Sequence, residues 1–236
     1  MTSSLYRHEE IPYAIRRSGR ARRARIVVEG GAVEVVVPRR MPLREVAPFV
    51  AEKRRWIERT VRRQREAEAA APAVRLCDGG AVPYLGRELR LRVRVEPGRV
   101  RAHVARRGEE LRVAVAAPGP PAVRDALESW YRRRARAEVA DRLDAAVARA
   151  GASYASLSIR GQRTRWASCS DRGAMSFNWR LLLAPEEILD YVVEHEVAHL
   201  HVMGHSPRFW SLVETRCPDW RTHERWLRRY GSTLRL

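Results

Sequence analysis

The side chains best suited to chemistry in this sequence are histidines that cluster towards its C-terminal end. Four of the seven histidines lie between His195 and His205, and the first two belong to a His-Glu-x-x-His motif that ends at His199. On a helix, positions i and i+4 share a face, so the rings of His195 and His199 can bind one metal ion. Glu196 is turned aside from that face, which suits a base that takes a proton from metal-bound water better than it suits a ligand.

His205 is the expected third ligand. It follows Gly204, where we expect the motif helix to end, and it precedes Ser206-Pro207, which reads as the N-cap and first position of another helix. His201 lies two residues past His199 and is therefore expected to face solvent. Other side chains that could fold back to supply the third ligand are Glu214, Cys217 and Asp219.

The expected cofactor is one Zn²⁺ ion per chain. Three protein ligands leave the fourth tetrahedral position open for water, as in catalytic zinc sites, and bound zinc lowers the pKa of that water to about 7. An imidazole-rich site also accepts other divalent ions, so the spacing alone does not fix the metal. A fourth protein ligand such as Cys169 would instead indicate a structural site, although a buried structural thiol is the more ordinary role for this residue.

The elements around the motif must hold these side chains in place. We expect the motif helix to begin at Pro185 with two acidic residues in its first turn. A broad apolar surface predicts that this helix is largely buried. Before it, Met175 to Leu181 alternate apolar and polar side chains, which predicts a strand with one packed face and one polar face. Such a strand could offer its backbone to an extended peptide, although an ordinary amphipathic strand explains the pattern equally well.

Polar side chains near the motif are candidates for substrate binding. Four of them, all except Ser176, could also stabilise an oxyanion, although surface or packing roles explain them as well. The candidates are Arg165, Ser176, Asn178, Arg180 and Tyr191.

Three segments of the sequence, Arg165–Leu181, Tyr191–Glu196 and Gly204–Trp210, resemble the YgjP-like metallopeptidase family, relatives of the SprT-like zinc proteases. The resemblance is good over about residues 75 to 230 and looser in the N-terminal part. One departure is Ala167, where the family usually has Gly, so the local turn here could differ. Another is Gly204, where family members often carry Asn, and both residues tolerate a left-handed helix end.

The resemblance implies a zincin-type metallopeptidase, without indicating its substrate. Some SprT-like proteases act on proteins bound or crosslinked to DNA. The residues to which the resemblance assigns roles are His195, His199 and His205 as zinc ligands and Glu196 as catalytic acid and base.

The charge of the chain favours polyanionic partners. The formal net charge is +18, and the excess of basic over acidic side chains is +9 in residues 1–75, +6 in residues 76–150 and +3 in residues 151–236. Arginine clusters in the first region suit phosphate contacts, although a solvated basic surface is the alternative. Lys53 is the only lysine, so a general bias towards arginine explains part of the count. The candidate nucleic-acid-binding residues are Arg22, Arg23, Arg25, Arg54 and Arg55.

Composition predicts a globular cytoplasmic protein. The hydrophobic content is 45%, no apolar run is long enough for a membrane span, and the first 25 residues lack a signal-peptide pattern. Cys77, Cys169 and Cys217 are too few and too widely spaced for a disulfide framework, which fits a reducing compartment. We therefore expect no membrane partner.

The organisation predicts an α+β chain, with a zincin-like metallopeptidase core and an N-terminal β-strand and helix module. The N-terminal basic ββα-like module is expected at 1–74 and the metallopeptidase domain at 75–236. Within the latter, we expect a three-stranded meander and a long helix over 81–150 and the catalytic part over 151–236. An order of strands, proline, helix and tryptophan occurs twice, once in each region before the catalytic part.

The leading hypothesis is a zinc-dependent metallopeptidase that hydrolyses peptide bonds of a protein or peptide substrate, with Glu196 as general base. A second hypothesis is a basic nucleic-acid-associated protein, which combines with the first in a protease recruited to DNA-bound protein. A third is a non-catalytic fold that zinc stabilises.

Overall fold

The computed structural model describes residues 5–8, 11–71, 74–162 and 165–236. The chain divides into two compact units, of which unit 1 comprises Met1–Pro72 with Arg229–Thr233 and unit 2 comprises Ala73–Arg228 with Leu234–Leu236. Helices and small sheets are mixed in this architecture, which confirms the predicted α+β class. Within the described ranges, no helix is both long enough and apolar enough to cross a membrane.

Unit 1 contains a four-stranded sheet followed by helices. The strands are β1 (Leu5–His8), β2 (Ile11–Ser18), β3 (Arg25–Glu29) and β4 (Ala32–Pro38), in the order β1-β2-β4-β3. The helices are η1 (Leu43–Glu45), α1 (Val46–Glu52) and α2 (Arg54–Ala70), and the short η3 (Gly231–Thr233) contacts α2. Gly30 and Gly31 take positive φ at the β3–β4 turn, a conformation that glycine adopts readily and that tight hairpin turns require. The module has two more strands than expected, because β2 pairs in parallel with β4, and parallel pairing between distant segments leaves no local sequence signal.

The first sheet of unit 2 consists of β5 (Ala81–Tyr84), β6 (Arg87–Val95), β7 (His103–Arg107) and β8 (Glu110–Val115), in the order β5-β6-β8-β7. The predicted meander is therefore wrong, since β6 pairs with β8 in parallel and β7 lies at the edge. The parallel register places Leu91 opposite Leu111 and Val93 opposite Val113. This pairing gathers the apolar side chains of both strands on one face, which is the reason it is preferred to a simple meander.

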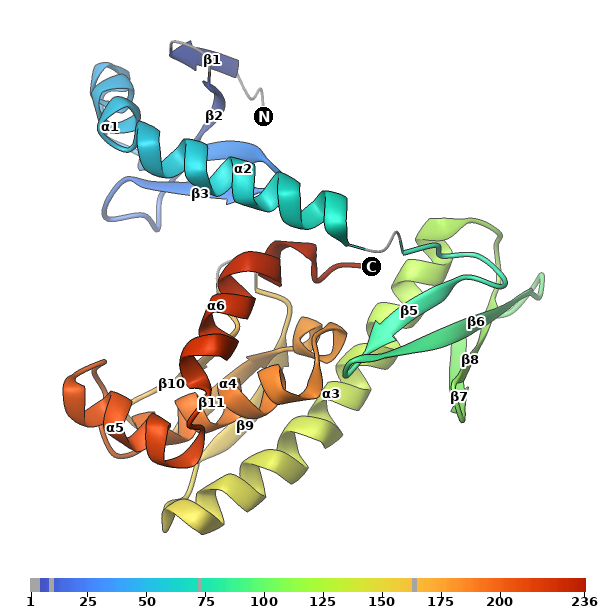
Figure 1. Ribbon diagram of the computed structural model, residues 1–236. Coiled ribbons are helices and arrows are strands. Elements are labelled where there is room, and N and C mark those ends of the chain that lie inside the picture. Colours follow the sequence, from blue (N-terminus) through green and yellow to red (C-terminus); the bar gives the residue numbers. More distant parts are fainter. Residues whose placement is uncertain (1–4, 9–10, 72–73, 163–164) are drawn as a thin grey trace. The chain divides into compact units, whose positions relative to one another are not determined.

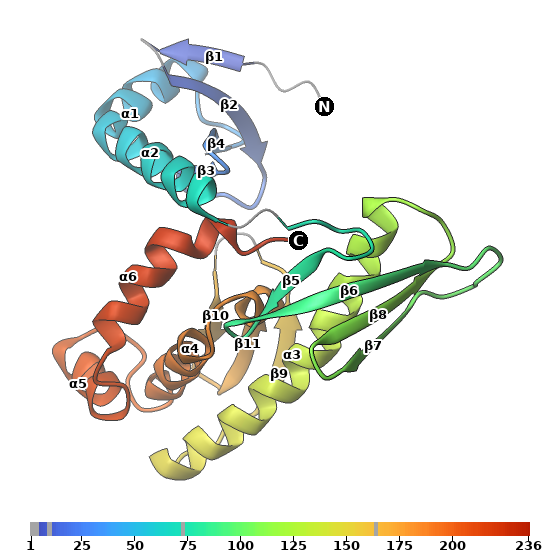
Figure 2. The same ribbon diagram turned by 45° about the vertical axis from the view of Figure 1, so that its right-hand side comes forward.

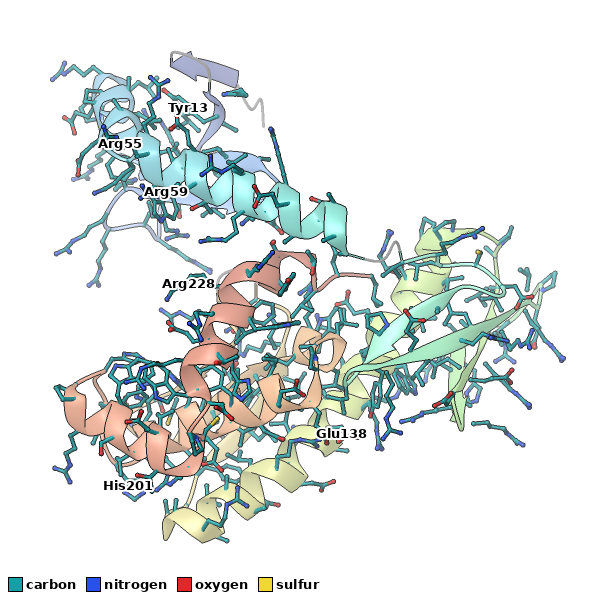
Figure 3. The ribbon with its side chains drawn as sticks, viewed as in Figure 1. Tyr13, Arg55, Arg59, Glu138, His201 and Arg228 are labelled. Atoms are coloured by element: carbon teal, nitrogen blue, oxygen red, sulfur yellow. The ribbon has the colours of Figure 1, made fainter. Side chains whose placement is uncertain are left out.

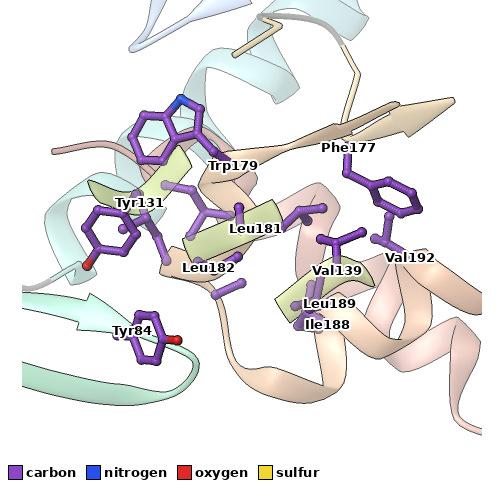
Figure 4. Packing of buried hydrophobic residues seen from close by; sticks show 14 of the residues in the cluster. Tyr84, Tyr131, Val139, Phe177, Trp179, Leu181, Leu182, Ile188, Leu189 and Val192 are labelled. Carbon is purple, nitrogen blue, oxygen red and sulfur yellow. The ribbon is translucent and has the colours of Figure 1, made fainter. Parts of the chain in front are cut away.

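The long helix α3 (Pro120–Ala150) organises unit 2. It begins with two prolines after Gly119 and ends at Gly151, whose φ of 61° is the left-handed conformation that terminates helices. It contacts β7 and β8 on one side of the unit and also β9, η2 and α4 (Figures 1 and 2). Buried side chains from α3, η2 and α4 meet in one core (Figure 4). The His-Glu-x-x-His motif is thus carried by a helix, α4, that packs on α3.

The rest of unit 2 carries the predicted site. Its strands are β9 (Ser156–Arg160), β10 (Ala167–Cys169) and β11 (Ala174–Asn178), in the order β10-β11-β9. Its helices are η2 (Trp179–Leu183), α4 (Glu186–His199), α5 (Pro207–Arg216) and α6 (Trp220–Tyr230), and the last residues of α6 fall in unit 1.

The strand predicted over Met175 to Leu181 needs two corrections. It ends at Asn178, after which Trp179–Leu183 form a 3₁₀ helix, and the predicted polar face is buried rather than exposed. Asn178 is only 2% exposed because its amide donates to the backbone carbonyls of Gln162 (2.7 Å) and Arg165 (3.3 Å). The polar side chain therefore holds a neighbouring segment in place and does not face solvent.

Candidate metal centre

Helix α4 begins as its sequence requires. Pro185 is the N-cap, and Glu186 and Glu187 occupy the first turn, where the helix dipole favours acidic side chains. The apolar side chains of α4 are buried as predicted, and they fix the helix against the core of unit 2. The buried positions include Ile188, Leu189, Val192, Val193 and Val197.

The end of α4 differs from the prediction. The helix ends at His199, before Gly204, because Leu200 donates to Val197 O and Val202 donates to Ala198 O in a tightened last turn. The chain then leaves the helix and brings His205 back towards the motif. Ser206 caps the next helix as predicted, since its hydroxyl accepts a hydrogen bond from the backbone of Phe209 at 3.4 Å.

The structure brings His195, His199 and His205 together. One nitrogen from each ring lies within 4.8 Å of the others, and the Nε2 atoms of His195 and His205 are 3.1 Å apart. Two imidazoles on one tetrahedral zinc, at about 2.0–2.1 Å each, would have nitrogens about 3.3 Å apart. The observed spacing therefore fits one metal ion of this size.

The surroundings of the imidazoles favour metal binding. His199 Nδ1 lies 3.1 Å from Val202 O, so its N–H can donate there and leave Nε2 for a metal. Burial, together with the neighbouring charges of His199 and His205, lowers the pKa of His195 to about 3. Burial also lowers the pKa of His199. Both rings are thus neutral at physiological pH, which is the form that binds metals.

An aromatic shell supports the three rings. Phe209 is fully buried and stacks on His199, with ring centroids 4.4 Å apart. It meets the rings of His195 and His205 edge-on, at 4.9 and 4.8 Å. Beyond it, Trp210 stacks on Trp220 at 4.1 Å, which ties α5 to α6. Packing of this kind restricts how far the imidazoles can rotate.

Glu196 lies beside the three histidines in a low-polarity environment. It is 5% exposed, and burial raises its pKa to about 7 against the opposing effects of a hydrogen bond from the backbone N–H of Cys169 and the charge of Arg165. The bond from Cys169 ties the carboxylate to β10. The Cys169 thiol itself has its pKa raised to about 11 by burial and by Glu196, so it stays protonated.

The rival ligands do not join the cluster. Among the side chains that the structure describes, the histidine trio is the one group of three or more that could hold a metal ion. Glu214 instead accepts a hydrogen bond from Arg221 at 2.6 Å. His201 is exposed, as expected from its position (Figure 3).

A pocket of about 360 Å³ opens beside His195 and Glu196. Trp166, Val192 and Leu227 supply its apolar walls, and charged side chains of the 165–167 segment and α6 complete the lining. The contribution of α6 was not predicted from the sequence, although the spacing of its residues on one helix face was a usable signal. The charged lining residues outside the motif are Arg165, Glu224 and Arg228.

The candidate substrate residues separate into two groups. Arg165 and Tyr191 line the pocket, and burial raises the pKa of Tyr191 above its ordinary range, so its hydroxyl is neutral. Ser176 and Asn178 are buried in β11 and do not line it. Arg180 stacks on the ring of Trp179, with its guanidinium carbon 4.7 Å from the centroid. Ser176, Asn178 and Arg180 therefore pack against other parts of the protein and do not line the pocket.

Of the two strands nearest the motif, β10 and not β11 lies at an edge of the described sheet, and β9 is the other edge strand. The strand directly before the motif helix was one candidate to offer its backbone, but β11 lies between β9 and β10 and is paired on both sides, which favours the alternative of an ordinary packed strand. In the described sheet β10 is an edge strand, and α4 contacts it. Edge strands are where an extended peptide can add by main-chain hydrogen bonds.

Three converging imidazoles and a buried carboxylate in an α+β unit are the arrangement of a metallopeptidase. The comparison of sequences places the chain more narrowly. Residues 22–230 match the YgjP-like family, described as a YgjP-like metallopeptidase domain, and the chain belongs to that family. The match begins inside unit 1, so the family domain extends beyond the segment with the clearest resemblance.

Two solved structures are similar over part of the chain. The metallopeptidase zymogen of Pyrococcus abyssi abylysin is 28% identical, with a TM-score of 0.33, covering 38% of this chain and 91% of its own. The metallopeptidase zymogen of Methanocaldococcus jannaschii jannalysin is 16% identical, also with a TM-score of 0.33, covering 37% of this chain and 94% of its own. No relative among curated protein sequences matches.

Proposed function

We propose that this protein is a zinc-dependent peptidase of the His-Glu-x-x-His type that hydrolyses peptide bonds in protein or peptide substrates. His195, His199 and His205 would hold one zinc ion, with Glu196 as general base. The observation that carries the proposal is the convergence of three imidazoles, one of which, His195, lines a pocket together with the buried carboxylate of Glu196. Family membership supports the peptide substrate class.

The chemistry divides between the metal and the protein. When bound, zinc supplies a Lewis acid that polarises the carbonyl and lowers the pKa of its water. Glu196 would act as the general base that takes a proton from the attacking water, and it would then deliver that proton to the leaving amine. A carboxylate with a pKa of about 7 is well matched to both transfers near neutral pH. Arg165 and Tyr191, which line the same pocket, are the remaining candidates for stabilising the developing oxyanion.

Substrate orientation follows from the sheet. An extended peptide paired with the free edge of β10 would run past Glu196, because the backbone of Cys169 in β10 donates to this carboxylate. A side chain of the peptide could then enter the pocket walled by Trp166, Val192 and Leu227. We therefore propose a large apolar side chain next to the cleaved bond.

The test is metal content by elemental mass spectrometry, with peptide-library cleavage run on the same samples. We expect one zinc per wild-type chain, loss of zinc in His205→Ala, and retained zinc without cleavage in Glu196→Gln. His201→Ala is the matched control, because it removes an exposed imidazole four residues before the proposed ligand His205. Full cleavage by Glu196→Gln, or metal content unaffected by His205→Ala, would contradict the assignment. A fourth protein ligand on the metal would instead favour a structural zinc site.

A second candidate function is association with nucleic acid, alone or as a means of recruiting the peptidase to bound proteins. Arg22, Arg23, Arg25 and Arg55 are exposed, which favours it, whereas Arg54 is half-buried and pairs with Glu58 at 2.9 Å. Binding of DNA or RNA with a steep salt dependence is the test. We also propose a cytoplasmic location, which the three unpaired cysteines support.

A further inference from the structure

The two four-stranded sheets are built alike. In each, the first strand pairs antiparallel with the second, the second pairs in parallel with the fourth, and the third pairs antiparallel with the fourth. The strand order is β1-β2-β4-β3 in unit 1 and β5-β6-β8-β7 in unit 2. A helix follows the fourth strand in both.

The register agrees in two of the three strand pairings, with one displacement of 76 positions. In the third pairing, Glu29 with Ala32 and Arg107 with Glu110, both partners are displaced by 78 positions. Leu5 pairs with Ala14 and Ala81 pairs with Arg90, a displacement of 76 positions for both partners. The same displacement relates the pair Arg16 and Val36 to the pair Arg92 and Arg112. It also relates two ion pairs, since Arg16 contacts Glu34 at 2.9 Å and Arg92 contacts Glu110 at 3.0 Å. The sheets are therefore two copies of one module, and their helices can be compared.

In the second copy, helix α3 contacts other elements on more than one side. α3 contacts β7 and β8 of its own sheet, and it also contacts α4, η2 and β9 of the catalytic part. α2 buries Ile57, Thr60 and Ala67 on one side. The arginines on its opposite side are exposed, whereas α3 buries apolar side chains along most of its length. One side of α2 is therefore exposed, whereas α3 packs against other elements on more than one side.

This exposed face of α2 combines positive charge with an aromatic ring. Arg55 and Arg59 lie one turn apart on α2 (Figure 3), Arg62 follows at helical spacing, and all three are exposed. Trp56, the residue after Arg55, is 44% exposed. Arg62 has only a distant partner, Glu66 at 4.0 Å, and both side chains are mostly in solvent. Within the described ranges, Arg55 and Arg59 form no ion pair. We call Arg55, Trp56, Arg59 and Arg62 the Trp56 surface.

We propose that the Trp56 surface binds single-stranded nucleic acid, with the guanidinium groups on backbone phosphates and the indole stacked on a base. Single-strand binding surfaces combine these two elements, because every unstacked base offers a flat face to an aromatic side chain. A duplex would satisfy the arginines but keep its bases stacked, and an acidic peptide need not offer a flat ring. The proposal deepens the second candidate function and does not depend on the peptidase assignment.

The experiment uses the full-length chain, a short fluorescein-labelled oligothymidylate and fluorescence anisotropy over a range of salt concentrations. We expect Trp56→Leu to weaken binding about fivefold to 150-fold, the range for loss of one stacked base, and Trp56→Phe to stay within about threefold of wild type. The triple variant Arg55→Gln, Arg59→Gln, Arg62→Gln should lower the salt slope by about 2, since each phosphate contact to a single strand contributes about 0.7.

The matched control removes the same number of positive charges at another site. In it, Arg90, Arg94 and Arg107 of the second sheet are replaced by Gln. These side chains are also exposed. Equal weakening in both triple variants would show that only net charge matters and would overturn the proposal. So would binding of a same-length duplex or of heparin that matches the oligothymidylate and is unaffected by Trp56→Leu. Circular dichroism melting verifies that each variant is folded. If Trp56→Leu does not fold, the comparison of the two arginine triple variants still tests the proposal.

Discussion

Phe209 offers a direct test of whether packing around the imidazoles prepares the metal site. Its ring is fully buried, stacks on His199 at 4.4 Å and meets His195 and His205 edge-on. Replacement by Leu keeps the site apolar but removes the flat surface against which the three rings are aligned. We expect the variant to fold and to bind metal more weakly.

Two magnitudes follow for Phe209→Leu. Lost ring contacts of about 0.5–1.5 kcal/mol and imperfect repacking of up to about 1.5 kcal/mol predict that the metal-free protein loses about 1–3 kcal/mol of unfolding free energy. Removal of supporting contacts around metal ligands typically weakens affinity about 10- to 100-fold. Stabilisation by saturating zinc should then be smaller than in wild type by about 1.4–2.8 kcal/mol.

The assay is denaturant unfolding with and without zinc, together with zinc titration against a competing chelator. Phe177→Leu is the matched control, because Phe177 is equally buried, lies in β11 of the same unit and makes no recorded ring contact with the three histidines among the described residues. It should lose similar stability without zinc and keep the full gain on adding zinc. If the two variants lose equal zinc affinity, the effect comes from general loosening and the argument for ring alignment is refuted.

Further predictions concern the scaffold. Glu138→Gln should cost about 2–3 kcal/mol at neutral pH, because Glu138 accepts hydrogen bonds from Tyr84 (2.7 Å), Arg134 (2.7 Å) and Arg142 (2.5 Å). Burial opposes the ionisation of Glu138, but these partners outweigh burial and hold its pKa below the ordinary 4.5. The variant should therefore show the full loss of unfolding free energy above about pH 4.5, and the loss should vanish in stronger acid. Urea unfolding across pH measures this dependence. Leu143→Ala, at a fully buried position of α3, should cost about 2–5 kcal/mol by the same assay, and a neutral result would contradict the assigned core. Gly80→Ala should destabilise by at least about 1–3 kcal/mol in thermal melts, because a Cβ there would lie 1.9 Å from the carbonyl oxygen of Arg75, whereas the control Gly204→Ala meets nothing within 4 Å and should be neutral.

Local features of the sequence could be predicted well. Pro185 and the acids after it gave the start of α4, Ser206 gave the cap of α5, and Gly151 gave the end of α3. Each of these signals acts within a few residues, through a missing N–H, a side-chain cap or a left-handed backbone. The spacing of the histidines is local in the same sense, since a helical turn places His195 and His199 on one face.

Long-range pairing could not be predicted in the same way. The parallel registers of β2 with β4 and of β6 with β8 depend on which apolar faces can be buried together, and no residue within either strand encodes its partner. The burial of Asn178 has the same origin, because the carbonyls of Gln162 and Arg165 that its amide reaches come from a preceding segment. The alternation of apolar and polar residues over 175–181 indicates which side chains are polar, but it does not indicate which groups form hydrogen bonds with them.

The proposed ligands follow largely from local sequence, whereas the chemistry proposed for them depends on long-range packing. The motif alone accounts for two imidazoles and a carboxylate, but the properties of that carboxylate come from elsewhere in the chain. Burial beneath neighbouring elements raises the pKa of Glu196 to about 7, and the backbone of Cys169 in β10 limits that rise. An identical motif on an exposed helix would carry an ordinary glutamate, ionised at neutral pH and poorly suited to hold a proton. The sheet and α3, which hold β10 and α4 together, therefore contribute to the proposed catalysis as directly as the histidines do.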